Sequence, residues 1–374
     1  MIIAGEASGD MHGAGLINEL KKLDPSLEIF GIGGDKMIAA GMNAQFNIKQ
    51  MAFLGFIEVI RHLPFIQKVK GVLLKTVEEN NIDTIVLIDY PGFNLNIAKK
   101  FKRLGKKMVY YISPQVWAWG KGRIKKIRKL VDKMIVVFPF EEKMYHDNNV
   151  DAVYVGHPLV EQISNYNFLS NEKLYSKFGL DNSKEILLIL PGSRKHEIRK
   201  IFPECIKASD KLAADFNLQI VVACAGNIDE HIFTGLSDNV EYKLVKGFTY
   251  DLLKISKFGI IKSGTSTLEA GFFKLPFIVV YSTNFLTYWL GKKVVKINNI
   301  AMANIILGET VVEELIQQDV NESNIYSKCA EFLKDDKKIE SLKNRLGLIE
   351  EKLGKSGASA RAAGIVNFYL NEAK

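Results

Sequence analysis

The chain has 374 residues, 47% of them hydrophobic and 25% charged, and its 50 Lys and Arg against 42 Asp and Glu give a net charge of +8. This length favours two domains, and the composition excludes a disordered, collagen-like or coiled-coil protein. The three cysteines are widely spaced, which excludes a disulfide framework and a zinc-ligand pattern and favours a reducing cytosol. We expect no signal peptide and no transmembrane helix, because no apolar run reaches the ~18 residues that span a bilayer. The positive charge leaves nucleic acid, an anionic membrane and a phosphorylated substrate open as partners.

Short apolar runs alternate with longer amphipathic stretches, as is typical of β-α-β units. In chain order, the predicted strands are 1–4, 27–31, 84–88, 108–112, 133–137, 152–155, 186–190, 218–224, 259–262 and 277–281. The clearest predicted helices are 13–23, 66–80, 94–104, 203–216 and 265–273, and residues 311–374 are expected to be helical. Most strands are apolar without alternation, which indicates burial on both faces of parallel sheets. The predicted fold class is therefore α/β with doubly wound layers.

The strand–helix pattern occurs twice along the chain. The first set of strands ends near residue 155 and the second begins near residue 186, with Gly156-His157-Pro158 and a polar stretch between them. Domain boundaries fall in such connections, so we predict one domain over 1–158 and a second over 159–345. A helical segment over 346–374 follows, and its packing back on the N-terminal domain is left open.

The first strand is followed by the loop GEASGD, residues 5–10. In α/β proteins, ligands bind beyond the carboxyl ends of the strands. Gly5 and Gly9 permit close approach of a ligand, and the following helix start offers N–H groups to an anion. The carboxylates of Glu6 and Asp10 would repel a phosphate, and the alternative is a tight turn with Ser8 or Asp10 as the helix cap.

Asp89 follows the predicted strand 84–88 and opens the loop DYPGFN. Catalytic groups of α/β proteins lie at such strand ends, and partial burial would raise the pKa of Asp89 toward that of a useful general base. The alternative is that Asp89 only caps the next helix, which Asn94 could also do.

The strand 108–112 ends in the loop SPQVWAWG, which is followed by the basic stretch 121–129. Trp117 and Trp119 are costly to expose, so we expect them to pack against a ligand or a neighbouring domain. The basic stretch is most simply a solvated helix face.

In the second half, the strand 186–190 is followed by Gly192, Ser193 and Arg194. Glycine, a hydroxyl and an arginine suit a phosphate, because an arginine can hold two phosphate oxygens at once. This loop is the first half of a predicted nucleotide diphosphate site.

A second loop of this kind contains Gly264, Thr265 and Ser266 at the start of a predicted helix. Glu269, expected in the first turn of that helix, could accept hydrogen bonds from both ribose hydroxyls. The alternative is a capping box of Thr265 or Ser266 with Glu269. Two such loops in one domain predict a nucleotide diphosphate site without a Walker lysine.

Neither a metal ion nor another cofactor is expected. No His, Cys and Asp cluster has metal-ligand spacing, and a D-x-D motif is absent from the sequence. Arg194, backbone N–H groups and a helix start would then stabilise a leaving phosphate.

Five motifs occur in order: GEASGD (5–10), DYPGFN (89–94), SPQVWAW (113–119), LPGSR (190–194) and SGTSTLE (263–269). Each is weak alone, but together they are specific, and the chain resembles the lipid-A-disaccharide synthases of Gram-negative bacteria. The likeness runs from residue 1 to about 312, and the last sixty residues match mainly by helical character. It implies two Rossmann-like domains facing a central cleft, the GT-B architecture, and an inverting, metal-independent glycosyltransferase.

The resemblance implies transfer of 2,3-diacylglucosamine from its UDP donor to 2,3-diacylglucosamine 1-phosphate, lipid X, which forms a β-1,6-linked disaccharide 1-phosphate and UDP. The N-terminal domain would take the acceptor and face the membrane, and the C-terminal domain would bind the UDP-sugar. The family's base falls on Asp89, its phosphate-binding arginine on Arg194, its nucleotide-contacting glutamate on Glu269 and a donor-phosphate asparagine on Asn304. Gly92 departs from the family, since many members carry an acidic residue there, and this leaves Asp89 as the sole candidate base in its loop.

Residues 51–66 are unusually rich in large apolar side chains, among them Phe53, Leu54, Phe56 and Ile57. Apolar groups surround most of this stretch, so we predict that it dips into the membrane interface and contacts acyl chains. The alternative is a helix buried between domains. Residues 99–133 hold thirteen Lys and Arg and one acidic residue, which favours an anionic inner-membrane surface as a partner. We therefore expect a cytoplasmic protein that is peripherally associated with the inner membrane.

Two other functions stay open at this point. Another GT-B sugar-nucleotide enzyme, a UDP-GlcNAc 2-epimerase or a GlcNAc transferase, would share the fold, but an epimerase would need further carboxylates and a histidine. A non-catalytic nucleotide-sugar-binding protein at the membrane surface would keep Arg194 and Glu269 but could lose Asp89. Nucleic acid is not expected, because the basic residues are not interleaved with exposed aromatic residues. Some members of the family form dimers by exchanging C-terminal segments, so a homodimer is left open.

Overall fold

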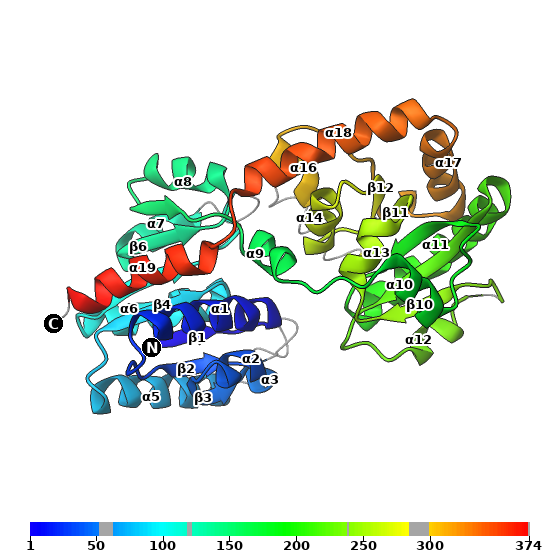
Figure 1. Ribbon diagram of the computed structural model, residues 1–374. Coiled ribbons are helices and arrows are strands. Elements are labelled where there is room, and N and C mark those ends of the chain that lie inside the picture. Colours follow the sequence, from blue (N-terminus) through cyan, green and yellow to red (C-terminus); the bar gives the residue numbers. More distant parts are fainter. Residues whose placement is uncertain (52–62, 118–121, 238, 284–298, 373–374) are drawn as a thin grey trace. The chain divides into compact units, whose positions relative to one another are not determined.

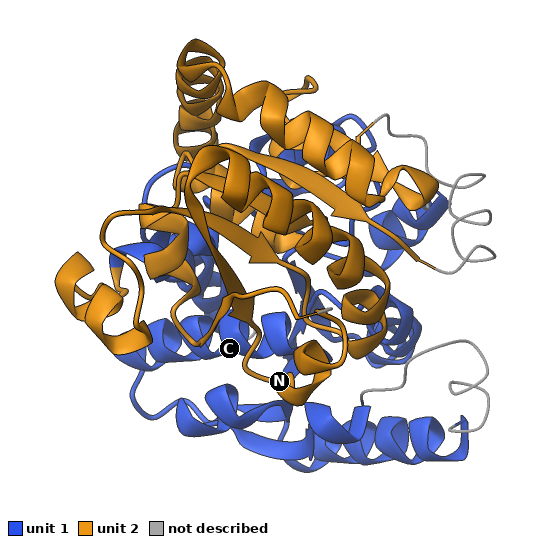
Figure 2. Ribbon diagram, turned by 90° about the vertical axis from the view of Figure 1, so that its right-hand side faces the viewer, with its two compact units in different colours: residues 1–164, 353–374 blue, residues 165–352 orange. Residues whose placement is uncertain are grey.

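The computed structural model describes residues 1–51, 63–117, 122–237, 239–283 and 299–372 (Figure 1). The chain divides into two compact units, coloured separately in Figure 2. Unit 1 comprises residues 1–164 and 353–374, and unit 2 comprises residues 165–352. The domain boundaries predicted from the sequence are 158 and 345, and the second of these lies inside helix α18 (Asp336–Leu353).

Unit 1 is built on a seven-stranded sheet in the order β3-β2-β1-β4-β5-β6-β7, and each of its strand pairs is parallel. Its strands are β1 (Ile2–Ala4), β2 (Phe30–Gly33), β3 (Asn43–Asn47), β4 (Thr84–Ile88), β5 (Lys107–Tyr111), β6 (Lys133–Val136) and β7 (Ala152–Tyr154). Its described helices are α1 (Ala7–Leu23), α2 (Asp35–Ala39), α3 (Ile48–Met51), α5 (Leu63–Glu79), α6 (Pro91–Arg103), α7 (Gly122–Leu130), α8 (Pro139–His146), α9 (Pro158–Ser164) and α19 (Ala358–Asn371).

Helices cover both faces of this sheet. On one face, buried residues of α5, α6 and α7 such as Val69, Phe101 and Ile127 share a core with buried strand residues such as Leu87 and Tyr110. On the other face, the C-terminal helix α19 packs against α1, β4 and β5 (Figure 1). The last helix of the chain therefore completes the layer that begins with the first helix.

Unit 2 repeats the same plan with a six-stranded parallel sheet in the order β10-β9-β8-β11-β12-β13. Its strands are β8 (Glu185–Leu190), β9 (Leu218–Cys224), β10 (Lys243–Lys246), β11 (Phe258–Lys262), β12 (Phe277–Tyr281) and β13 (Glu314–Ile316). Its helices in the described ranges are α10 (Asn171–Phe178), α11 (Lys195–Phe216), α12 (His231–Thr234), α13 (Thr249–Ile255), α14 (Thr265–Phe272), α16 (Met302–Leu307), the 3-10 turn η1 (Gln317–Asp319), α17 (Glu322–Leu333) and α18.

The three strands that sequence analysis missed, β3, β10 and β13, all lie at sheet edges. An edge strand has a neighbour on one side only and is less buried, so its sequence need not be a continuous apolar run. Because β13 and η1 interrupt residues 311–374, the expectation of uniform helix there is wrong.

Two predicted helix starts are wrong by more than one helical turn. Helix α1 begins at Ala7 rather than at 13, so most of GEASGD belongs to its first turns. Helix α11 begins at Lys195 rather than at 203, and Pro203 lies inside it. The proline signal was misleading because a helix can carry an internal proline when surrounding packing offsets the lost hydrogen bond.

Candidate active site

The polar loops predicted from the sequence meet at one point in each sheet. The strand order reverses between β1 and β4 in unit 1 and between β8 and β11 in unit 2. Ala4 pairs with Ile88 at the end of the first two strands, and Leu190 pairs with Ile261 at the end of the second two. Ligands of open α/β sheets bind beyond the carboxyl ends of strands at such switch points.

The backbone at Asp89 and Tyr90 is left-handed, with φ angles of 43° and 47°. Such angles strain residues other than glycine, and strained turns are found at functional sites. The Asn94 Nδ2 group donates to the carbonyl oxygens of Asp89 (2.8 Å) and Ile88 (3.2 Å), and the Tyr110 hydroxyl also donates to the Asp89 carbonyl. Neither Asp89 nor Asn94 caps α6, whose N-cap is Tyr90 without a side-chain cap. Asn94 instead holds the turn that presents Asp89.

The environment of Asp89 shifts the protonation of its carboxyl group. The pKa of Asp89 is raised to about 6, mainly by burial and secondly by the negative charge of Glu6, while a hydrogen bond from the Tyr90 backbone N–H acts in the opposite direction. A general base works best when its pKa lies near the operating pH. The Asp89 carboxyl therefore has the protonation behaviour of a base at neutral pH.

The glycines of the first loop allow close packing. A Cβ atom at Gly5 would lie 2.2 Å from Cδ1 of Tyr90, so the Tyr90 ring occupies the space that a side chain at Gly5 would need. A Cβ atom at Gly9 would lie 3.2 Å from the Cβ of Ala4, so α1 passes close to β1. Glu6 and Ser8 are exposed between these two glycines.

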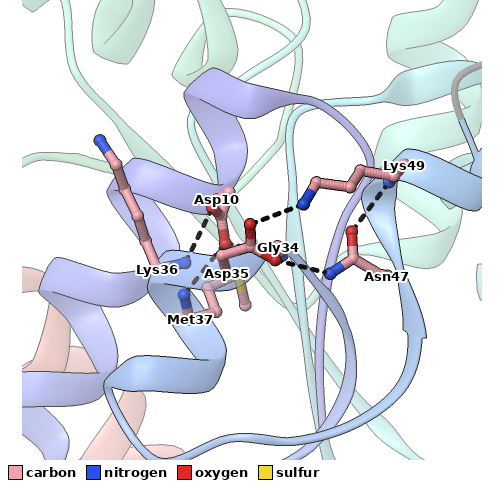
Figure 3. Close-up of polar contacts among 7 residues, drawn as sticks. All are labelled: Asp10, Gly34, Asp35, Lys36, Met37, Asn47 and Lys49. Atoms are coloured by element: carbon pink, nitrogen blue, oxygen red, sulfur yellow. Dashed lines mark hydrogen bonds and ion pairs between the residues drawn. The ribbon is translucent and has the colours of Figure 1, made fainter.

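Asp10 has a different structural role from the one expected. The N-cap of α1 is Glu6 without a side-chain cap, so the alternative that Ser8 or Asp10 caps this helix is wrong. Asp10 is 6% exposed. Its carboxylate accepts from three backbone N–H groups around the start of α2 (Figure 3), those of Gly34 (2.7 Å), Lys36 (3.2 Å) and Met37 (3.0 Å). Asp10 therefore links α1 to α2. The three N–H donors compensate the negative charge of its buried carboxylate.

Glu141, which sequence analysis did not single out, holds the loop after β5. Its carboxylate is 1% exposed and accepts from Oγ of Ser113 (2.6 Å) and Nε1 of Trp117 (3.1 Å). Burial raises the pKa of Glu141 to about 7. Trp117 also packs edge-on against Phe140, so these contacts lie within unit 1, and Trp119 lies outside the described residues. The only sequence signal for Glu141 was an acidic residue that follows an apolar run.

In unit 2, Gly192, Ser193 and Arg194 connect β8 to α11. Gly192 has a φ of 110°, which favours glycine, and Arg194 is the N-cap of α11. Behind them, the buried carboxylate of Glu197 forms ion pairs with Arg194 (3.3 Å) and Lys262 (2.9 Å). The side chain of Arg194 is 54% exposed, so its guanidinium remains accessible. Lys262 is not among the site residues predicted from the sequence.

The second loop brings Gly264, Thr265 and Ser266 beside the first, at the start of α14. Gly264 is the N-cap, with a φ of 156° and no side-chain cap, so the capping box of Thr265 or Ser266 with Glu269 is wrong. Glu269 also lies beyond the first turn. Burial raises the pKa of Glu269 to about 7, and the Tyr250 hydroxyl donates to its carboxylate (3.5 Å). A carboxyl group that is partly protonated near neutral pH can both donate and accept hydrogen bonds.

Asn304 is fully buried in α16. Its Oδ1 accepts from the backbone N–H groups of Val311 (2.7 Å) and Val312 (2.9 Å). Its Nδ2 donates to the Val312 carbonyl (2.9 Å) and to Oε1 of Glu314 (2.8 Å). These four bonds use the full capacity of the amide, so Asn304 holds its loop and has no hydrogen bond left for a phosphate in this structure.

Comparison with known proteins decides the family. Residues 1–366 match the model of the Lipid-A-disaccharide synthetase family. The chain is 40% identical to the lipid-A-disaccharide synthase of Geobacter metallireducens, over 98% of this chain and 96% of the relative. It is 36% identical to that of Coxiella burnetii, over 98% and 97%. The chain belongs to the lipid-A-disaccharide synthetase family.

This membership confirms the resemblance read from the five motifs, and the chain is accordingly a glycosyltransferase that forms the lipid A disaccharide. It favours this function over the two alternatives, another GT-B sugar-nucleotide enzyme and a non-catalytic binding protein.

Solved structures alone would not have separated these possibilities. The UDP-GlcNAc 2-epimerase of Neisseria meningitidis bound to UDP-GlcNAc aligns with a TM-score of 0.66 at 11% identity, over 99% of each chain. The calicheamicin glycosyltransferase CalG4 aligns with a TM-score of 0.61 at 15% identity, over 99% of this chain and 98% of the other. Such likenesses show the fold alone, and they confirm the predicted two-domain α/β class.

Some features predicted for this family member lie outside the described residues. Phe53, Leu54, Phe56 and Ile57 all fall in the stretch 52–62. Within the described ranges, no helix is long and apolar enough to cross a membrane. In the same ranges, no three His, Cys, Asp or Glu side chains are grouped to hold a metal ion.

Proposed function

We propose that the enzyme transfers 2,3-diacylglucosamine from its UDP donor, bound by unit 2, to lipid X, bound by unit 1. The reaction inverts the configuration at C1 of the donor sugar and needs no metal ion. The observation that carries this proposal is the pair of switch points. One presents a partly buried carboxyl with a pKa near 6, and the other presents two glycine loops with an accessible arginine.

In this mechanism, Asp89 accepts the proton of the acceptor 6-hydroxyl. The hydroxyl oxygen attacks C1 of the donor sugar from the face opposite UDP, so the C1–phosphate bond breaks as the new glycosidic bond forms. Arg194 and the backbone N–H groups at the start of α14 bear the negative charge that grows on the leaving diphosphate. Glu269 accepts from the ribose hydroxyls, while Gly5, Glu6, Ser8 and Gly9 form the acceptor side. Asn304 acts by holding the loop before β13.

Two structural relatives support a UDP ligand. One is described as a UDP co-structure of MnaA from S. aureus, with a TM-score of 0.68, 15% identity and coverage of 99% of this chain and 96% of that chain. The other is the Neisseria epimerase with UDP-GlcNAc. We infer the same class of nucleotide for unit 2, because its two loops offer the hydroxyls, N–H groups and arginine that a diphosphate requires.

Incubation of the protein with UDP-2,3-diacylglucosamine and lipid X tests the whole proposal. We expect mass spectrometry to detect the tetra-acyl disaccharide 1-phosphate, and NMR to assign the β configuration to the new linkage. The rate should be unchanged in EDTA, because charge on the diphosphate is balanced by protein groups. An α-linked product would contradict inversion, and a rate that EDTA abolishes and Mg²⁺ restores would contradict metal independence.

We also propose that residues 52–62 contact acyl chains at an anionic inner-membrane surface. In this proposal the enzyme is a cytoplasmic protein that is peripherally associated with the inner membrane. The support is the apolar stretch with Phe53, Leu54, Phe56 and Ile57, together with the basic residues of α7. Changing Phe53, Leu54 and Phe56 to Ser should reduce flotation with vesicles that contain anionic phospholipid. Flotation equal to that of the wild type would contradict the proposal. The homodimer stays a prediction.

A further inference from the structure

A lysine that belongs to none of the predicted loops lies beside both glycine loops of unit 2. Lys262 is the last residue of β11, and its side chain is 14% exposed. A Cβ atom at Gly192 would lie 3.5 Å from its Cδ atom, and a Cβ atom at Gly264 would lie 3.9 Å from its Nζ atom. The ammonium group is therefore placed where the two loops come together, at the switch point between β8 and β11.

The charges around Lys262 do not cancel. Nζ of Lys262 lies 2.9 Å and Nη1 of Arg194 lies 3.3 Å from the same carboxylate oxygen, Oε1 of Glu197. One carboxylate can balance only one of these two cations, so the cluster keeps one positive charge. Burying a lysine is costly unless it is paired. An ammonium group has three N–H donors, and a single carboxylate oxygen cannot satisfy all of them.

We propose that Lys262 binds the diphosphate of the donor together with Arg194, and that Glu197 positions both cations. This inference rests on the proposed function of unit 2 as the UDP-binding half of the enzyme. Lys262 approaches from the end of β11, while Arg194 comes from the loop after β8, so each of the two neighbouring strands supplies a cation. Both would stabilise the charge that develops on the diphosphate when its bond to the sugar breaks.

Binding measurements on the full-length protein test the role of Lys262. We expect Lys262→Met to raise the dissociation constant of UDP by about ten- to hundredfold, because hydrogen bonds to charged groups contribute about 1.5–3 kcal/mol each. The affinity for uridine, which lacks phosphate, should not change. Lys262→Arg should stay within a few-fold of the wild type, and it provides the test if the Met variant does not fold. Unchanged UDP binding in Lys262→Met, or a loss of UDP binding in Lys262→Arg with intact uridine binding, would overturn the inference.

The chain offers a matched control at the other end of the same strand pair. Lys257 precedes β11 and forms an ion pair with Glu185 at the start of β8. Lys257→Met removes a Lys–Glu ion pair near the amino ends of β8 and β11, away from their carboxyl ends, so UDP affinity should remain at the wild-type value. An equal loss in both variants would mean that the effect comes from sheet stability, and would overturn the inference.

A double variant separates phosphate binding from simple charge balance. The double variant Lys262→Met with Glu197→Gln is compared with Glu197→Gln alone, because Glu197 also pairs with Arg194. If Lys262 only neutralised Glu197, adding Lys262→Met to Glu197→Gln would not weaken UDP binding further, and the inference would be overturned. If Lys262 contacts the diphosphate, the double variant should bind UDP more weakly than Glu197→Gln and bind uridine equally well. A wild-type protein that binds neither UDP nor uridine would overturn the donor site itself, and with it this inference.

Discussion

Asp89→Asn should lower kcat by about 10²–10⁴-fold, the usual contribution of a general base. The amide cannot accept the proton of the 6-hydroxyl, but it has nearly the same shape as the carboxyl group. Asparagine also tolerates the left-handed φ of 43° at this position, so the turn held by Asn94 and Tyr110 should persist. UDP affinity should be unchanged, because the proposed role of Asp89 is to take a proton from the acceptor hydroxyl and not to bind the nucleotide.

Asp83→Asn provides the control for this substitution. Asp83 directly precedes β4, Asp89 directly follows it, and Asp83 forms an exposed ion pair with Lys106 (2.9 Å). The same chemical change at the amino end of the strand should leave kcat within about twofold, because an exposed ion pair contributes at most about 1 kcal/mol to stability. Full turnover in Asp89→Asn would exclude Asp89 as the base.

The dependence of rate on pH gives a second test of Asp89. A base must be ionised, so kcat/KM should rise with pH up to the Asp89 pKa of about 6 and then level off. Glu6→Gln removes a negative charge that raises this pKa, so the rise should move to lower pH. A rise at the same pH in the variant would show that Glu6 does not act on the base.

The raised pKa of Asp89 also predicts how the stability of unit 1 changes with pH. Between its ordinary pKa of 3.8 and about 6, Asp89 holds a proton in the folded protein but not in the unfolded chain. Its contribution to stability is therefore greatest below 3.8 and is lost as the pH rises to about 6. At neutral pH the ionised Asp89 should destabilise unit 1, so Asp89→Asn should melt no lower than the wild type.

Asp10→Ala should destabilise unit 1 strongly. The buried carboxylate accepts three N–H groups at the start of α2, and its removal leaves these donors without partners (Figure 3). Each lost bond to a charged group costs about 1.5–3 kcal/mol, and we expect a total of about 3 kcal/mol or more. For a unit of this size, that corresponds to a fall of about 6–12 °C in the Tm of unit 1.

Asp35→Ala is the matched control, because Asp35 is the neighbouring carboxylate in Figure 3. Its side chain is 69% exposed and pairs with Lys49 (2.7 Å) on the surface. Its removal should lower the Tm much less than the removal of Asp10, because an exposed ion pair contributes little to stability. Hydrogen exchange should also accelerate at Gly34, Lys36 and Met37 in Asp10→Ala alone. Equal Tm values for the two variants would contradict the linking role of Asp10.

Particular residues show how much of the site could be predicted. Asp89 directly follows an apolar run and Arg194 lies in the loop after another, and the ends of buried parallel strands are where α/β proteins place ligands. The roles of Asp10 and Lys262 could not be found in the same way. Asp10 bonds to residues 24 to 27 positions away, and Lys262 pairs with a glutamate 65 positions earlier, so neither partner leaves a local pattern.

The fold also divides into features with a local sequence pattern and features without one. The central strands were predicted because burial on both faces requires continuous apolar runs, whereas the edge strands β3, β10 and β13 were not. The alternatives in which Ser8, Asn94 or Thr265 caps a helix depended on local spacing and are wrong, because the N-caps are Glu6, Tyr90 and Gly264, none with a side-chain cap.

The sequence by itself determined the α/β class, the family and the residues that end the central strands, since these depend on apolar periodicity and on short motifs. Only the tertiary structure decided that Glu6 and Asp89 are neighbours, that the C-terminal helix α19 completes unit 1, and that Arg194 and Lys262 share one carboxylate. The physical reason is that strand order brings together residues that are far apart in the chain. The charge interactions and burial that set a pKa or balance a cation exist only after that order has formed.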